Sequence, residues 1–178
     1  MRPSPGMIGN NARALGWSVI SVLGPMGRDV ADTALLFSAS VGRDAMDPLV
    51  FPNDPAKFWP LQQFDLSKLR IGYTEDFGVC IVGQEIRRTF RKRIEALSSL
   101  VATCEPIDFK LGDPDRAFDI LRAENFVSSF AHIYRTAPET LGANICANME
   151  IASSITLADR AWAHLEQTKI TRQFAAAT

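Results

Sequence analysis

Three pairs of adjacent serines come nearest, by type and spacing, to a nucleophilic site in this chain. They are Ser98-Ser99, Ser128-Ser129 and Ser153-Ser154. A serine attacks a carbonyl when a base lies within hydrogen-bond reach and when free backbone N–H groups hold the developing oxyanion. None of the three pairs lies in a glycine-rich turn that would present a hydroxyl in this way. We therefore interpret them as packing or capping hydroxyls.

The cysteines and histidines raise the alternative of a thiol nucleophile or a metal site. They are Cys80, Cys104, Cys146, His132 and His164. Zinc ligands normally occur in close pairs such as Cys-x-x-Cys or His-x-x-x-His, and the sequence has no such pair. We expect both histidines to be structural residues satisfied by their neighbours, and Cys80 to be at most an oxidation-sensitive thiol. Three widely spaced cysteines suit reduced thiols and predict a cytoplasmic protein.

The densest charge in the sequence is a run of five basic residues within seven positions. The run consists of Arg87, Arg88, Arg91, Lys92 and Arg93. A nucleic-acid surface presents such residues together with aromatic side chains, but on a helix four of these five (Arg87, Arg88, Arg91 and Lys92) cluster on the side away from Phe90, and the formal net charge of the chain is -1. We predict a solvated helix face and no nucleic-acid partner. No apolar run approaches the roughly 18 residues of a membrane span, so we expect no membrane association.

The patterns that would position these side chains alternate between strand and helix. β-branched residues over 17–23 predict a buried strand, and apolar residues over 28–40 predict a helix that stops at Gly42. Residues 69–73 and 105–109 predict two short strands, one on each side of a clear amphipathic helix over 83–100. This spacing is typical of a βαβ crossover and favours a sheet covered by helices.

The remaining patterns predict one long connection and two further helices. Residues 43–68 are rich in Asp, Pro and Phe and read as an ordered connection held down by its aromatic side chains. Asp113 and Pro114 form a helix start, and Pro138 ends that helix. Thr156 opens a last helix, which runs to about residue 174.

Several motifs in the first 78 residues are more specific than these patterns. Arg2-Pro3-Ser4-Pro5-Gly6 is followed about twenty residues later by Gly24-Pro25-Met26, and Arg28, Val30 and Asp32 continue the second motif. Gly42-Arg43-Asp44-Ala45-Met46-Asp47-Pro48 comes next, before the strand pattern at 69–73. In order and spacing, these motifs resemble the segment that follows the catalytic signature of the amidase signature family. Gly27, where that family usually has alanine, is a departure without chemical consequence.

The resemblance implies an α/β fold, as a fragment of the amidase signature fold (a mixed sheet covered by helices), helix-rich with few strands in this piece. That family hydrolyses carboxamides with a Ser-Ser-Lys triad, in which one serine attacks and the lysine acts as base through the other. These residues precede the motif that opens this chain. The resemblance therefore assigns no catalytic, cofactor-binding or metal residue here, implies no cofactor, and gives Arg28 an architectural role.

We expect residues 1–178 to be a single incomplete domain, a partial amidase domain lacking its N-terminal catalytic half and its C-terminal end. Met1 stands where the family has an apolar residue before Arg-Pro, and Ala175-Ala176-Ala177-Thr178 stands where an apolar strand follows. The predicted function is part of an amidase that hydrolyses a carboxamide C–N bond to a carboxylate and an amine or ammonia. We expect the isolated chain to be inactive, a small-molecule amide to bind only in the full-length parent, and a homo-oligomer to be one option.

Two alternatives stay open from the sequence. The first is a non-catalytic binding module derived from an amidase, with the apolar side of the helix over 118–134 as its docking surface. The second is an independent hydrolase that uses Cys80 or a serine pair. Hydrolysis of simple amides by the isolated chain, abolished by Cys80→Ala, would support the second alternative.

Overall fold

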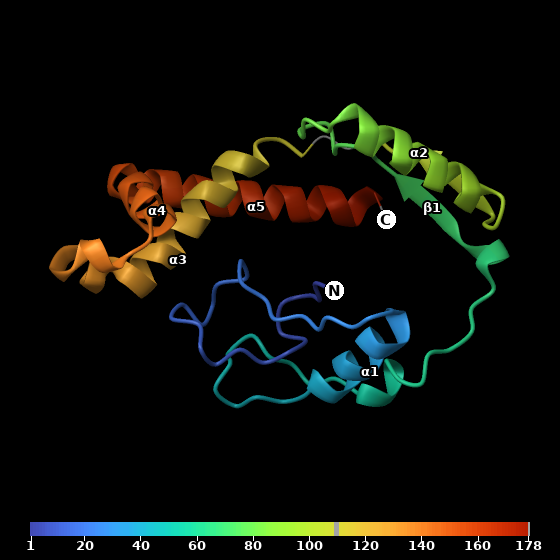
Figure 1. The fold of residues 1–178 in the computed structure, drawn as a ribbon, viewed down its shortest axis with the longest axis horizontal. Helices are drawn as coiled ribbons and strands as arrows, with labels where there is room; N and C mark the ends of the chain where they lie inside the picture. The colour runs from blue at the N-terminus through green and yellow to red at the C-terminus, as the bar shows by residue number, and fades with distance from the viewer. Residues whose placement is uncertain (109–110, 178) are drawn as a thin grey trace. The chain divides into compact units, whose positions relative to one another are not determined.

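The computed structural model describes residues 1–108 and 111–177, which fall into two compact units. The first unit holds residues 1–62 and 119–156. The described part of the second unit holds residues 63–108, 111–118 and 157–177. The boundary between them falls within a helix, α3. The elements along the chain are α1 (Val30–Ser40), β1 (Arg70–Tyr73), α2 (Gln84–Ser98), β2 (Thr103–Pro106), α3 (Pro114–Thr136), α4 (Ala143–Ser154) and α5 (Leu157–Ala177) (Figure 1).

Helix α1 of the first unit begins where Asp29 caps it. Asp29 Oδ1 accepts a hydrogen bond from the backbone N–H of Asp32 at 2.8 Å, which satisfies one of the free donors of the first turn. The helix ends next to Gly42, as predicted. Its inner side buries Phe37, whose ring lies 4.8 Å from that of Phe58. This contact ties the connection after α1 to the helix, whereas Phe51 and Phe64 of the predicted aromatic set are exposed.

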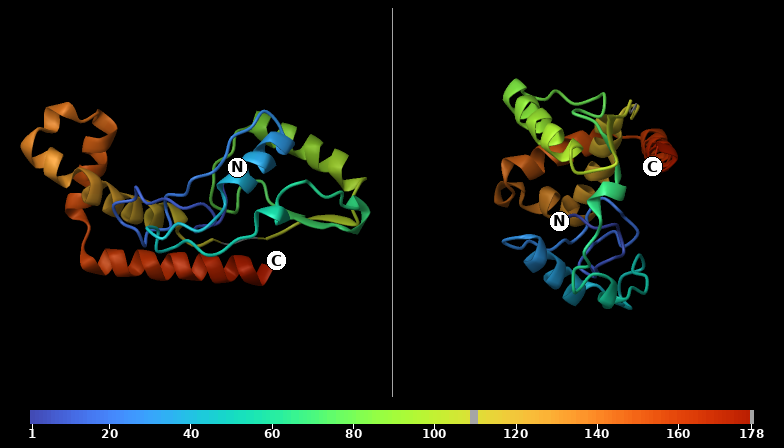
Figure 2. Two further views of the ribbon diagram at one scale, coloured as in Figure 1. Left: turned by 90° about the horizontal axis from the view of Figure 1, so that it is seen from below. Right: turned by 90° about the vertical axis from the view of Figure 1, so that its right-hand side faces the viewer.

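The prediction of a strand over residues 17–23 is wrong, because this segment pairs with no strand and runs as irregular chain (Figure 2). Side chains hold its backbone instead of a neighbouring strand. Arg13 donates from Nη1 to the carbonyl oxygen of Ser18 at 2.8 Å, and Asn125 donates to the Ser18 hydroxyl at 3.1 Å. β-branched residues indicate half-buried backbone, but a strand also needs a hydrogen-bonded partner.

Two helices complete the first unit. Beyond its first turns, α3 buries Ile120, Leu121 and Ala123, and it ends before Pro138 as predicted. Helix α4 was not predicted from the sequence. Its hydrophobic periodicity is weak, and it buries a polar residue, Asn148, whose Nδ2 donates to the carbonyl of Asn144 at 2.7 Å. A helix that buries a polar side chain hydrogen-bonded within itself does not show the spacing of apolar residues by which helices are predicted.

The second unit contains the predicted βαβ crossover. Strands β1 and β2 are parallel, with Arg70 opposite Thr103 and Tyr73 opposite Pro106. Helix α2 connects them and packs on the sheet through Phe90, whose ring centre lies 6.1 Å from that of Tyr73. β2 begins two residues earlier than the predicted strand 105–109, because it pairs along the four residues of β1. Phe109 of that prediction lies outside the described residues.

The start of α3 and helix α5 are joined by polar contacts within the second unit. Gly112 adopts a φ of +74°, and the next residue, Asp113, donates its N–H to Glu166 Oε1 at 3.1 Å. Arg116 binds Asp159 at 2.9 Å, and its guanidinium lies 4.2 Å from the ring centre of Trp162. The predicted Asp113 cap is confirmed, because its Oδ1 accepts from the Arg116 N–H at 3.3 Å.

Candidate functional site

The structure commits most hydroxyls of the serine pairs to the backbone of their own helices. Ser98, Ser99, Ser128, Ser153 and Ser154 donate to the carbonyl three residues earlier, at 2.8, 3.0, 2.8, 2.7 and 2.9 Å. A hydroxyl held in this way contributes to the helix and is not aimed at a substrate. Ser153 and Ser154 close α4 and lie just before the last helix, as the sequence predicted. Ser129 differs from the others because it lines a groove.

The structure keeps the thiols and imidazoles apart. Cys80 is exposed, and Cys104 and Cys146 are half-buried free cysteines. His132 and His164 are exposed, on α3 and α5 respectively. Over residues 1–108 and 111–177, no three residues of metal-binding type come together.

A groove in the first unit lies beside residues of the N-terminal segment. It has a volume of about 330 Å³ and lies between the loop at 10–14, Ser21 and one side of α3. From α3 it is lined by Asn125, Phe126, Ser129 and Phe130. Because these residues are spaced one and four apart, they share one side of the helix.

A buried ion pair involves one of the residues that line this groove, Arg13. Arg13 Nη2 binds Asp47 Oδ2, with 6% of the arginine side chain and none of the aspartate side chain exposed. Asp47 also accepts the backbone N–H groups of Asn10 at 2.7 Å and Leu49 at 2.9 Å. A buried charge persists only when it is paired and hydrogen-bonded in this manner. The pair therefore fixes the 10–14 loop, which forms one wall of the groove.

The contacts of Asp47 keep it ionised. Burial raises its pKa, but the N–H groups of Leu49 and Asn10 and the Arg13 guanidinium together outweigh burial, so the pKa of Asp47 lies below its ordinary value of 3.8. At neutral pH the carboxylate is negative and cancels the Arg13 charge. Among the described residues that line the groove, Arg13 alone is ionisable, and its charge is balanced by that of Asp47.

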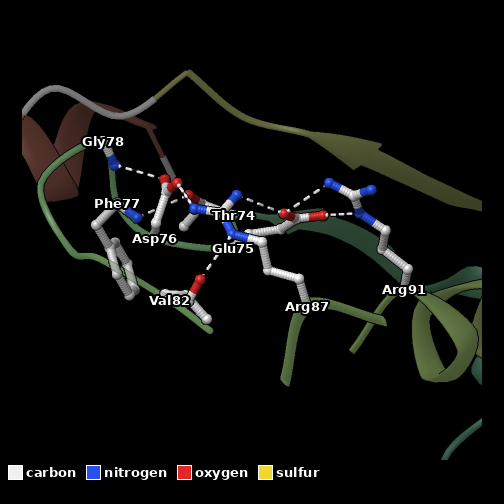
Figure 3. A network of polar contacts seen from close by, with 8 residues as sticks. All are labelled: Thr74, Glu75, Asp76, Phe77, Gly78, Val82, Arg87 and Arg91. Atoms are coloured by element: carbon white, nitrogen blue, oxygen red, sulfur yellow. Dashed lines mark hydrogen bonds and ion pairs between the residues drawn. The ribbon is translucent and has the colours of Figure 1, made fainter. Parts of the chain in front are cut away.

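A second polar cluster lies in the turn between β1 and α2 (Figure 3). Arg87 donates to Glu75 Oε2 at 2.9 Å and to Asp76 Oδ2 at 2.7 Å, and Arg91 donates to Glu75 Oε2 at 3.0 Å. The hydrogen bond from Arg91 is the largest cause that lowers the pKa of Glu75. The same turn holds Phe77 and Gly78 at φ of 52° and 71°. All four charged side chains are committed to shaping this turn.

This cluster changes the interpretation of the basic run on α2. Arg88, Lys92 and Arg93 are exposed, which confirms a solvated face for them. Arg87 instead turns toward the β1–α2 turn, where it also donates to the Val82 carbonyl at 3.2 Å (Figure 3). Arg28, the architectural arginine of the sequence analysis, is 90% exposed and pairs with Asp32 at 2.7 Å.

Comparison with known proteins places the chain in a family. The family profile described as Amidase matches residues 1–174. The chain belongs to the amidase signature family, as its N-terminal motifs predicted. A search of solved structures finds the fold of a bacterial aryl acylamidase of that family, with a TM-score of 0.82 and 21% identity. The match covers 98% of this chain and 38% of that one, and it confirms the helix-rich α/β fold.

Curated relatives are similar over part of the chain. A glutamyl-tRNA(Gln) amidotransferase subunit of Clostridium botulinum (strain Langeland) is 27% identical over 113 residues, 64% of this chain and 23% of the relative. The corresponding protein of Maricaulis maris (strain MCS10) is 33% identical over 88 residues, 49% of this chain and 18% of the relative. The chain thus matches less than a quarter of the length of these relatives. No described helix is both long and apolar enough to cross a membrane.

Sequence reasoning singled out Ser129 but missed the buried ion pair of Arg13 and Asp47. Asp47 lies in the Asp-Pro connection that the motifs singled out, but nothing marked it as a buried charge. Arg13 lies in an irregular segment without a recognisable pattern, and its partner is 34 residues away. The one available signal was the polar pair Asn125 and Ser129 on the otherwise apolar pattern of α3.

Proposed function

We propose that this chain takes part in hydrolysis of a carboxamide C–N bond. Water adds across the bond, giving a carboxylate and an amine or ammonia. In this proposal the chain supplies part of the substrate cleft, and the serine nucleophile, the second serine and the lysine base belong to residues outside 1–178. The single observation that carries the proposal is the Amidase family match over residues 1–174.

Two further observations support this division of work. The serine pairs offer no nucleophile with a base, because five of their six hydroxyls are bonded within their helices. Ser129, the sixth, lies in a groove whose lining has no lysine or histidine among the described residues. The similar proteins, an aryl acylamidase and a subunit of an amidotransferase, are also named for chemistry at amide groups.

The test combines the mass of the native protein with an amidase assay. We expect the protein purified from its source cells to exceed 19.6 kDa and to hydrolyse simple amides, and residues 1–178 produced separately to lack turnover. Turnover by residues 1–178 alone would contradict the placement of the nucleophile elsewhere. Failure of the native protein to release ammonia or amine from any of a broad series of amides would contradict the function itself.

A second candidate is a non-catalytic interaction module derived from an amidase. The observation that favours it is the exposure of apolar residues on α3, where Phe118, Val127 and Ile133 are 47%, 41% and 38% exposed. A native mass of 19.6 kDa without amide turnover, together with stable binding to an intact amidase, would favour this candidate over hydrolysis.

A further inference from the structure

The face of the β1–β2 sheet that lies away from α2 carries two opposite charges. Tyr73 packs toward Phe90 of α2, with ring centres 6.1 Å apart. Because side chains alternate along a strand, Arg70 and Gly72 of β1 point to the other face. Glu105 of β2 is the partner of Gly72 in the parallel register, so it shares that face with Arg70. Neither charged side chain makes an ion pair or hydrogen bond with any described residue.

This charged face of the sheet is hollowed. The hollow has a volume of about 500 Å³, which is within the usual range of small-molecule sites, and all of its described lining belongs to the second unit. Arg70, Thr103 and Glu105 supply its polar side chains, and Ile107 and Phe174 give it an apolar side. The Thr103 hydroxyl also makes no hydrogen bond with a described residue, so the hollow offers unused polar groups beside an apolar surface.

The apolar side begins directly next to the charges. Ile107 lies over the bare backbone of Gly72, where an added Cβ would be 2.7 Å from Ile107 Cγ2. Gly72 is itself opposite Glu105 in the register. A ligand whose charged groups contact the two strands therefore places its remaining atoms on Ile107 and toward Phe174.

The positions of the two charges suit one ligand that carries both signs. Neighbouring strands lie about 4.8 Å apart and rise about 3.3 Å per residue, which puts the Cα atoms of Arg70 and Glu105 about 8 Å apart. A simple anion is attracted by Arg70 and repelled by Glu105, and a simple cation meets the reverse. A zwitterion has a favourable partner for each of its charges, and a guanidinium can hold a carboxylate through two parallel hydrogen bonds.

We propose that this hollow binds a zwitterionic α-amino acid with an apolar side chain. Its carboxylate lies on Arg70, its ammonium group on Glu105, and its side chain against Ile107 and Phe174. The inference concerns binding alone, in the second unit, and it does not depend on the proposed amide hydrolysis. A protein that binds the amino acid but never hydrolyses an amide would refute the proposed function and leave this inference standing.

The experiment titrates three probes against the full chain and follows saturation-transfer difference NMR signals. The probes are L-leucine, the 4-methylpentanoate anion and the 3-methylbutylammonium cation, which share a branched apolar group and differ in the charges they carry. We expect saturable binding of L-leucine. Binding of the two singly charged probes should be at least fivefold weaker, because each loses one charge-assisted hydrogen bond and meets one repelling side chain.

Matched variants locate the binding and separate the two charges. Arg70→Gln should raise the Kd of L-leucine at least threefold without weakening 3-methylbutylammonium, which has no carboxylate. Glu105→Gln should raise the Kd of L-leucine similarly without weakening 4-methylpentanoate, which has no ammonium group. Lys92→Gln removes an exposed charge of α2 in the same unit and should leave all three affinities unchanged.

Three results would overturn the inference. They are the absence of saturable L-leucine binding, equal affinity for L-leucine and either singly charged probe, and equal Kd values for L-leucine in Arg70→Gln, Glu105→Gln and Lys92→Gln. All three replaced side chains are exposed, so we expect the variants to fold, and far-UV circular dichroism checks this. A variant that merely distorted the sheet would weaken all three probes together, which is distinct from the expected charge-specific pattern.

Discussion

The two units use acid–base pairs in opposite surroundings. In the first unit, Asp47 and Arg13 are buried and join two segments of irregular chain. In the second, Arg87 and Arg91 reach Glu75 and Asp76 beside solvent, with 31% of the Arg87 side chain and 67% of the Arg91 side chain exposed. Pairs of the same chemistry therefore join two irregular segments in the first unit and shape a single turn in the second.

The difference in burial between the two sets of ion pairs follows from how much regular secondary structure each region has to hold its backbone. The first 28 residues contain no helix or strand, so their backbone depends on side chains for its conformation. A buried charge supplies several strong, directed hydrogen bonds there, at the cost of desolvation. The second unit has the β1–β2 ladder and α2 for that purpose, and its charges only adjust one turn. Breaking a pair should be severe in the first region and mild in the second.

The largest effect is expected from Asp47→Ala. This change leaves the Arg13 guanidinium buried without its counter-ion, which should lower the free energy of unfolding by about 3–5 kcal/mol. Urea denaturation followed by circular dichroism measures the loss. Asp32→Ala is the matched control, because its pair with Arg28 is exposed and contributes about 0–1 kcal/mol. Equal losses in the two variants would contradict the comparison.

The pH dependence of stability should separate the buried pair in a second way. The pKa of Asp47 is lowered by folding from 3.8, so the unfolded chain takes up its proton first as the solution is acidified. The stability contributed by Asp47 is thus full above about pH 4 and is lost as the pH falls through the folded value. Thermal midpoints measured from about pH 7 to 2 should fall more steeply in the wild type than in Asp47→Asn. Parallel curves would show that Asp47 does not carry this dependence.

A smaller effect is expected from Gly112→Ala in the second unit. Gly112 has a φ of +74°, and an added Cβ would lie 2.0 Å from Glu166 Oε1. The left-handed conformation alone costs about 1–2 kcal/mol for alanine, and Glu166 must also move. Gly42→Ala is the control, since no atom beyond its chain neighbours lies within 4 Å of its Cβ position. We expect that change to be neutral or slightly stabilising, and a loss as large as that of Gly112→Ala would argue against the mechanism.

The smallest effect is expected from Arg87→Ala. This change removes the contacts to Glu75 and Asp76, and it should speed amide hydrogen exchange in the turn that contains Gly78 with little change in global stability. Since the cluster borders solvent, added salt should shrink the difference between variant and wild type. Arg88→Ala, on the exposed side of α2, should leave exchange in the turn unchanged. A global loss like that of Asp47→Ala would erase the contrast between the two units.

Regular elements of the second unit were predictable because local signals define them. The apolar spacing of α2, the Asp113-Pro114 start of α3 and the Thr156 start of α5 are contained within a few neighbouring residues. The parallel pairing of β1 with β2 followed from the length of the crossover. Only the extent of β2 was misplaced, because the partner strand and not its own sequence determines it.

The groove could not be predicted from sequence, because its parts meet only after folding. Ser18 reads as strand by its neighbours, yet its carbonyl is bound by Arg13 and its hydroxyl by Asn125, which is 107 residues away. Asn125 and Ser129 read as interruptions of an apolar helix. Whether these two residues line a groove depends on the 10–14 loop, which packs opposite them, and the local hydrophobic periodicity of the helix does not predict that contact.

The 34-residue separation of Arg13 and Asp47 also has a consequence during biosynthesis. At about 5–20 residues per second, a ribosome adds Asp47 about 2–7 s after Arg13. During that interval the N-terminal loop has a guanidinium but no counter-ion, so it cannot close around the charge. The loop around Arg13 therefore cannot close before α1 and the residues after it have been synthesised.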